Sequence, residues 1–254
     1  MSDHMLWAEA IDKVKAGDNA KAYAFFGHPS MSTSIFAPRI DSAFLLTPAG
    51  EKLSLAMKKG DWLPGYGHME YLFSDMMLYW PGDYLFCLVR TPGVYDMSWH
   101  GGESGLFLTR SFAKVIIHAE KDDPKAQDVQ ERQGTWDAGF PLEIIPEKPP
   151  YDAKAMETLK FRVKYLGQPI KANYYASYWA WDEKGDPRVQ RGTTDEDGSF
   201  SVNLIRGGMW IIDASFTQEE SGTLIAEDSH KFYKAGDVLE YKTIQVKTEL
   251  TIWV

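Results

Sequence analysis

Short segments in which apolar and polar residues alternate recur along the chain. Residues 158–165 read Thr-Leu-Lys-Phe-Arg-Val-Lys-Tyr, which gives one apolar and one polar face when the backbone is extended. Pro-Gly pairs and Gly/Asp turns separate such segments, a pattern typical of an antiparallel β-sandwich. We therefore predict an all-β protein. The expected strands cover residues 21–26, 43–47, 71–79, 84–89, 158–165, 173–181, 199–204, 209–216 and 242–254.

The middle of the chain is less regular and suggests a division. Residues 111–119 are apolar almost throughout, which fits either a strand or a short helix. Residues 120–135 are polar and charged, and we expect a loop there. Residues 147–150 read Glu-Lys-Pro-Pro, which is typical of a linker. We expect two β-sandwich domains, 1–140 and 141–254, the second Ig-like or transthyretin-like.

Composition excludes several classes of protein. The 254 residues are 44% hydrophobic and 14% aromatic, which excludes disorder of the whole chain. No apolar run approaches the roughly 20 residues that span a bilayer, so we expect no transmembrane segment. The net charge is −9 and no Lys/Arg cluster stands out, which argues against a nucleic-acid partner. Cys87 is the single cysteine, so an internal disulfide or a thiolate metal cluster cannot form.

Two histidines have unusual contexts. His4 lies almost at the amino terminus, in Asp-His-Met-Leu-Trp, and His28 follows an apolar run in Phe-Phe-Gly-His-Pro. Neutral imidazole is the commonest metal-binding side chain near pH 7. Two such groups brought together from separate strands would begin a transition-metal site. The alternative is a terminal tag remnant together with a turn histidine.

Both halves of the chain contain short, distinctive motifs. In the first half they are His4 to Trp7, Gly27-His28-Pro29, Trp80-Pro81-Gly82-Asp83-Tyr84 and Ala113-Lys114-Val115. In the second half they are residues 141–146, Leu166 to Ile170, Thr194 to Phe200 and Gly207 to Trp210. Together the motifs cover nearly the whole chain, and they resemble one family, the periplasmic component of nickel/cobalt uptake, long catalogued as a domain of unknown function. The turn motifs of the second half also occur in other Ig-like modules.

The resemblance implies a periplasmic binding protein, here without its signal peptide, that carries a nickel or cobalt ion and serves a membrane transporter component. It also implies that His4 and His28 are metal ligands. Related sequences often have a histidine just before the Ala/Thr-Lys pair, but Arg110-Ser111-Phe112-Ala113-Lys114 has none. We expect His68 or His100 to complete the site, because both lie in glycine-rich loops. His230, in a polar segment far along the chain, is left out.

Other functions stay open at this stage. Copper or zinc would also suit imidazole ligands, and the methionines of the first half would favour a periplasmic copper carrier if they were not core fillers. Trp179 and Trp181, which alternate onto one face with Tyr175, suggest a carbohydrate- or peptide-binding module if that face is exposed. If the face is buried, these rings are core. We expect no enzyme, because no general base stands beside the candidate ligands.

The amino terminus could itself take part. If processing leaves His4 first, its free α-amino group could join the imidazole in chelation, since that amine has a pKa of about 7.7–8.0. If Met1 alone is lost, Ser2-Asp3-His4 offers an amine, two amides and an imidazole, a square-planar set for Cu(II) or Ni(II).

Overall fold

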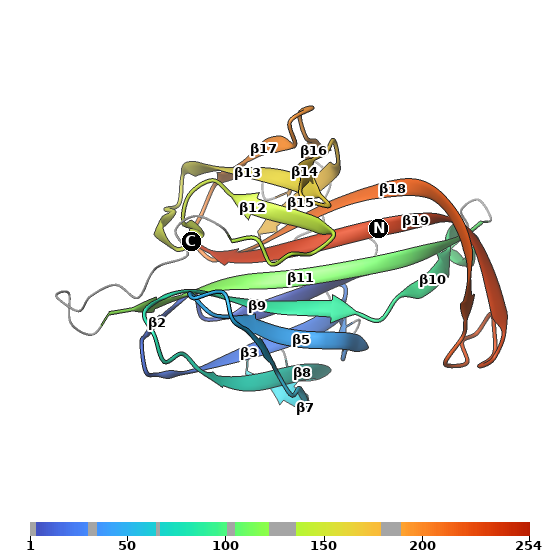
Figure 1. Ribbon diagram of the computed structural model, residues 1–254, viewed down its shortest axis with the longest axis horizontal. Coiled ribbons are helices and arrows are strands. Elements are labelled where there is room, and N and C mark those ends of the chain that lie inside the picture. Colours follow the sequence, from blue (N-terminus) through green and yellow to red (C-terminus); the bar gives the residue numbers. More distant parts are fainter. Residues whose placement is uncertain (1–3, 30–34, 65–66, 101–104, 122–135, 179–188) are drawn as a thin grey trace.

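The computed structural model describes residues 4–29, 35–64, 67–100, 105–121, 136–178 and 189–254. These residues form three stacked β-sheets (Figure 1), with two short 3-10 helices, η2 (Met97–His100) and η3 (Pro150–Asp152). The prediction of an all-β protein is confirmed. Among the described residues, no helix has the length and apolar character required to cross a bilayer.

Sheet A is the five-stranded layer at the bottom of Figure 1. Its strands are β1 (Met5–Ala10), β3 (Asn19–Gly27), β4 (Ile35–Phe36), β7 (Lys58–Leu63) and β8 (Gly67–Met77). β3 lies in the middle, antiparallel to β1 on one side and to β8 and β4 on the other. This arrangement fixes the relative positions of the two histidines that the sequence singles out.

Sheet B is the ten-stranded central layer. Its strands from the first half are β2 (Lys13–Lys15), β5 (Ile40–Leu46), β6 (Lys52–Ser54), β9 (Gly82–Arg90), β10 (Gly93–Asp96) and β11 (Leu106–Glu120). Those from the second half are β15 (Asn173–Tyr178), β16 (Val189–Thr193), β18 (Met209–Ile225) and β19 (Val238–Trp253). Sheet C, the upper layer, contains β12 (Leu142–Pro146), β13 (Glu157–Tyr165), β14 (Gln168–Pro169) and β17 (Ser199–Leu204).

Sheet B contains strands from both sides of residue 140. β11 pairs with β19 in parallel, with Phe107 opposite Thr243 and Val115 opposite Thr251. The expectation of an antiparallel sandwich is therefore wrong for the pair β11 and β19. A hairpin would make two strands antiparallel, but a long stretch of chain separates β11 from β19, so they can pair in parallel. The two expected units, 1–140 and 141–254, share one sheet. That each folds by itself stays a prediction.

Hydrophobic side chains fill both spaces between the layers. Trp210, Leu142 and Phe161 belong to the core between sheets B and C. Ala residues of β1 and β3 pack against sheet B on its other face. Trp7 and Phe25 point to the opposite face of sheet A, where they form a third cluster with Met209 and Ile211 of β18. β11 is buried on both faces, which explains its continuous apolar run and resolves residues 111–119 as strand.

Candidate functional site

The structure brings His4 and His28 together at the end of the β1–β3 ladder. Met5 lies opposite Gly27 in that antiparallel ladder. His4 precedes Met5 and His28 follows Gly27, so the two histidines lie side by side just beyond the end of the ladder. Their ring centroids are 4.6 Å apart. The His4 ring is exposed and also packs edge-on against Phe26 at 5.4 Å. The register of β1 against β3 therefore brings the two imidazole rings into contact at the end of the ladder.

The other two predicted ligands stand differently. His68 is an exposed residue of β8, opposite Trp62 of β7. His100 ends η2, and its side chain lies outside the described residues. In the described parts of the chain, no three His, Cys, Asp or Glu side chains form a group that could hold a metal ion. The assignment of His4, His28, His68 and His100 as one metal site stays a prediction. Residues 1–3, which the chelation hypotheses need, also lie outside the described residues.

Three methionines of the first half belong to the core, whereas Met77 and Met97 are exposed. Met5 and Met69 are buried in the cluster around Trp7, and Met76 is buried in the neighbouring cluster. These three thioethers fill space in the apolar core on the two faces of sheet A. Trp179 and Trp181, the centre of the carbohydrate or peptide hypothesis, lie outside the described residues, while Tyr175 of the same expected strand packs partly buried against the cluster around Trp7.

His4 also borders a cavity of about 520 Å³. Its polar floor comes from neighbouring positions of β11 and β19, where Thr109 pairs with Gln245 and Ser111 with Lys247. Its walls are largely aromatic, with Trp99 of η2 and Phe232 among them. The loop that connects β18 to β19 supplies one side, including His230. The sequence does not predict this position of His230, because no local pattern indicates that residues 226–237 return to the amino-terminal strands.

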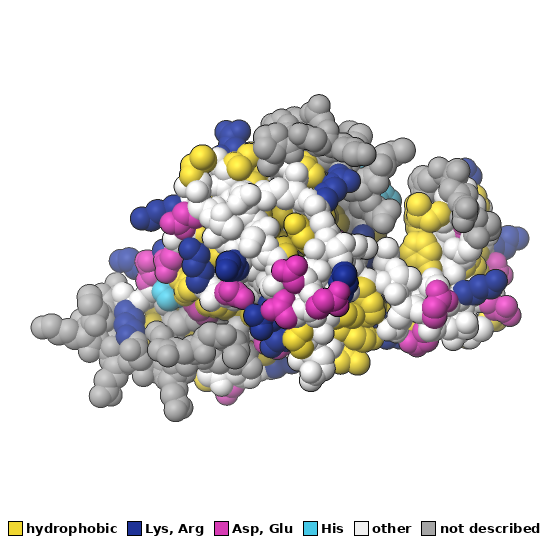
Figure 2. Space-filling view, turned by 90° about the horizontal axis from the view of Figure 1, so that it is seen from above, with side chains coloured by type: hydrophobic (Ala, Val, Ile, Leu, Met, Phe, Trp, Pro, Cys, Tyr) yellow, Lys and Arg dark blue, Asp and Glu magenta, His cyan; other side chains and the backbone are white. Residues whose placement is uncertain are grey.

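The β18–β19 hairpin reaches the cavity because it bends. The ladder shifts register between Glu219 and Gly222, and the far part of the hairpin curves away from the sheet (Figure 1). A Cβ at Gly222 would lie 2.5 Å from the Tyr241 hydroxyl, so glycine lets that ring approach the bulge closely. Seen from above, this arm forms a separate lobe with a hollow between it and the body (Figure 2).

Two kinds of contact hold the end of the arm. Arg39, just before β5, forms ion pairs with Glu227 at 2.5 Å and with Asp228. The rings of Trp99 and Phe232 stack with centroids 4.7 Å apart and planes 8° from parallel. Trp99 is itself positioned by a turn in which Asp96 accepts the N–H groups of Ser98 and Gly105. The exposed ion pairs contribute little to stability by themselves. We therefore attribute the position of the arm mainly to the stacking of Trp99 on Phe232.

Arg90 is the largest cationic group of the cavity wall. Its guanidinium carbon lies 4.2 Å from the centroid of the Phe26 ring, and its Nη1 donates to the Thr109 hydroxyl at 3.3 Å. Among the described residues, its Nε is buried without a hydrogen-bond partner, and Arg90 forms no ion pair with any of them. Burial lowers the pKa of this guanidinium, because desolvation disfavours the charged form.

A fully buried carboxyl group lies on the same face of β19, two residues beyond Lys247. Glu249 is opposite Asp213 of β18. Burial, and then the neighbouring carboxyl of Asp213, hold the pKa of Glu249 well above its ordinary value, while Lys247 acts in the opposite direction. At pH values above about 4.3 and below the raised pKa, the folded protein therefore keeps a proton on Glu249 that the unfolded chain releases.

This proton predicts a pH dependence of stability. The pKa of Glu249 is higher in the folded state than in the unfolded state. Its titration therefore makes the free energy of unfolding fall as pH increases from about 4.3 towards the folded-state pKa. Glu249→Gln mimics the protonated form and should raise the Tm at pH 8 by a few degrees, as 1 kcal/mol shifts Tm by about 2–4 °C in proteins of this size. Thermal unfolding of both proteins between pH 5 and pH 8 measures this. Glu240→Gln, an exposed change on the same strand, is the control, and a lower Tm for Glu249→Gln at pH 8 would contradict the prediction.

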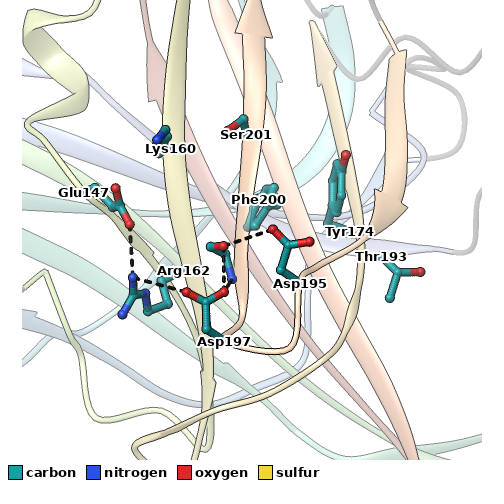
Figure 3. A pocket seen from close by; sticks show the side chains of 10 residues that line it. Glu147, Lys160, Arg162, Tyr174, Thr193, Asp195, Asp197, Phe200 and Ser201 are labelled. Carbon is teal, nitrogen blue, oxygen red and sulfur yellow. Dashed lines mark hydrogen bonds and ion pairs between the residues drawn. The ribbon is translucent and has the colours of Figure 1, made fainter.

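A second cavity, of about 510 Å³, lies beside sheet C. Ser199 donates its hydroxyl to Asp197 at 2.7 Å, and Asp195 lies within 3.3 Å of the same hydroxyl. Arg162 pairs with Asp197 at 3.7 Å (Figure 3). The Ser199 hydrogen bonds hold the pKa of Asp197 below its ordinary value. A Cβ at Gly198 would lie 2.3 Å from the Val163 carbonyl oxygen. This Asp-Glu-Asp-Gly-Ser motif therefore builds a tight turn, in which the side chains of Asp195 and Asp197 accept hydrogen bonds.

The motifs of the first half also have structural roles. The Tyr84 hydroxyl donates to the carbonyl oxygen of Trp80 at 3.0 Å and accepts its N–H at 2.9 Å. Asp83 accepts from the Trp136 indole at 2.7 Å and bonds the His118 ring at 2.7 Å. Lys114 is fully buried and pairs with Glu143. In the same half of the chain, the motif residues His4 and His28 place two imidazole rings at the end of the β1–β3 ladder.

Comparisons with known proteins give a family. Residues 2–218 match the family described as "Domain of unknown function (DUF4198)". No curated protein matches the chain. Among solved structures, dimeric latent PorU from Porphyromonas gingivalis aligns with 94% of this chain and 19% of its own, at 10% identity and a TM-score of 0.23, and this likeness carries no argument about function. The family description names no metal and no transporter. Because its match spans most of the sequence, the chain belongs to the DUF4198 family.

Proposed function

We propose that this protein binds a divalent transition metal, nickel or cobalt, in the periplasm and delivers it to an uptake transporter in the membrane. The observation that carries the proposal is the pair of rings of His4 and His28, whose centroids lie 4.6 Å apart. The resemblance of the ordered motifs to the nickel/cobalt-uptake component supplies the choice of metal and the transporter.

The chemistry of the pair suits delivery. Neutral imidazoles favour nickel, cobalt, copper and zinc over magnesium or calcium. Because the β1–β3 ladder positions both rings before any metal arrives, little ordering of the backbone accompanies binding. Two protein ligands leave further coordination positions for water, for His68 or His100, or for a group of the receiving transporter. A site with such exchangeable positions can release its metal.

Replacing His28 by alanine tests the pair directly. We expect nickel affinity, measured by isothermal titration, to fall at least tenfold, because the metal loses one of two prepositioned imidazoles. His4→Ala should have an effect of the same order. Since the neutral imidazole binds the metal, the affinity of the unmodified protein should also decrease as pH drops through about 6.5, the ordinary histidine pKa.

A third histidine serves as the control. His118 lies near the far end of β11 and is bonded to Asp83, and His118→Asn keeps a side-chain donor for that carboxylate. This variant should bind nickel as the parent does. Titrating His68→Ala and His100→Ala alongside shows which of them completes the site. Unchanged nickel affinity in both His4→Ala and His28→Ala would overturn the proposed function.

A further inference from the structure

We infer that the cavity beside His4 binds a small organic anion that joins a carboxylate to a flat apolar body. The site consists of the polar floor on β11 and β19, Arg90, and the aromatic groups of η2 and the hairpin arm. This inference does not depend on the proposed metal site, although His4 borders both. Its cavity of about 520 Å³ lies within the usual size range of small-molecule sites.

Charge is the first argument. The chain carries a net charge of −9, yet the described residues that line this cavity include Arg90, Lys231 and Lys247 and no Asp or Glu. The two histidines of the lining, His4 and His230, can only add positive charge. A concave surface whose fixed charges have one sign concentrates ligands of the opposite sign. The cavity therefore selects anions although the protein as a whole is acidic.

Arg90 gives the anion a defined place. A guanidinium has five N–H donors in a planar fork that matches a carboxylate. Here Nη1 donates to Thr109, the Phe26 ring covers one face of the group, and no described carboxylate forms an ion pair with it. Glu249 is the carboxyl group that acts on Arg90 through space, and burial favours the neutral form of that carboxyl. A partly desolvated arginine that forms no ion pair interacts more strongly with an incoming anion than a fully hydrated one. The Phe26 contact also holds the fork in one orientation.

The aromatic walls of the cavity indicate the apolar part of the ligand. Trp99 and Phe232 stack on each other, and Tyr95 packs edge-on against Phe107 at 5.5 Å. Aromatic walls favour a flat apolar group, since ring stacking adds to the burial of apolar area. A free inorganic anion would leave these walls without a partner. The combination of an aromatic wall and a single arginine thus points to a carboxylate with an attached ring.

The experiment uses probes that differ in charge but hardly in shape. Titrations of the full chain with benzoate and phenylacetate are compared with titrations of benzamide and phenylacetamide, and with acetate, which lacks the ring. We expect each ring carboxylate to bind at least tenfold more tightly than its amide and than acetate. Chelator-treated protein should give the same result, which separates this site from the metal site.

Variants locate the binding. Arg90→Gln should weaken carboxylate binding at least tenfold and leave amide binding unchanged, while Trp99→Leu should weaken both. Lys160→Gln, which removes an exposed lysine of the other cavity, is the matched control and should change neither. If Arg90→Gln fails to fold, the comparison of acid with amide on the parent protein still decides. Equal affinities for acid and amide, or no carboxylate binding at millimolar concentrations, would overturn the inference.

Discussion

Replacing Lys114 by methionine is expected to lower the free energy of unfolding by about 3–5 kcal/mol, because it leaves a buried carboxylate without its counter-charge. Lys114 and Glu143 are both buried and form an ion pair. The lysine also donates to the Trp136 carbonyl oxygen at 2.5 Å, and Glu143 accepts the N–H groups of Ala138 and Phe140 at 2.9 and 3.0 Å. Urea unfolding measures the loss.

The same variant should show a characteristic pH dependence. Burial raises the pKa of the Glu143 carboxyl, and Lys114 is the largest influence in the opposite direction. Without the lysine the folded-state pKa should rise further, so the variant's stability should fall as pH increases from about 4.3 towards that pKa. Lys59→Met, an exposed change on β7, should cost less than about 0.5 kcal/mol. A loss below about 1 kcal/mol in Lys114→Met at pH 8 would contradict the account.

Replacing Asp83 by alanine should cost about 2–3 kcal/mol, measured in the same way. Its carboxylate bonds the His118 ring at 2.7 Å and accepts from the Trp136 indole at 2.7 Å and the Tyr151 hydroxyl at 3.1 Å. Hydrogen bonds to a charged group each contribute about 1.5–3 kcal/mol, and partial exposure reduces the total. The loss should also loosen the stacking of His118 on Tyr151, whose centroids lie 4.5 Å apart.

A graded replacement separates charge from geometry at this position. Asp83→Asn keeps one acceptor oxygen, so it should lose less stability than Asp83→Ala but more than Asp61→Ala, an exposed change on β7. Equal stability of Asp83→Ala and Asp61→Ala would show that the cluster contributes nothing. Together with Lys114, Asp83 ties residues 136–152, which lead into and out of the first strand of sheet C, to the central sheet.

Most strands could be predicted from the sequence, because alternation and turn residues are local signals. The expected strand 199–204 coincides with β17, and the expected strands 84–89 and 158–165 fall within β9 and β13. Residues 111–119 could not be assigned, since a strand buried on both faces has no alternation. The expected pairing of His4 with His28 rested on their contexts, and the β1–β3 register brings them together.

The sequence by itself determined the all-β class, the positions of most strands and the two histidines worth testing, since each depends on neighbouring residues. Tertiary structure decided the parallel pairing of β11 with β19, the buried pair of Lys114 and Glu143, and the cavity between Arg90 and the hairpin arm. These features join residues more than 25 positions apart, and no local pattern records which distant strand or side chain will become a neighbour. The free energy gained by burying apolar area on both faces of sheet B determines which distant segments become neighbours.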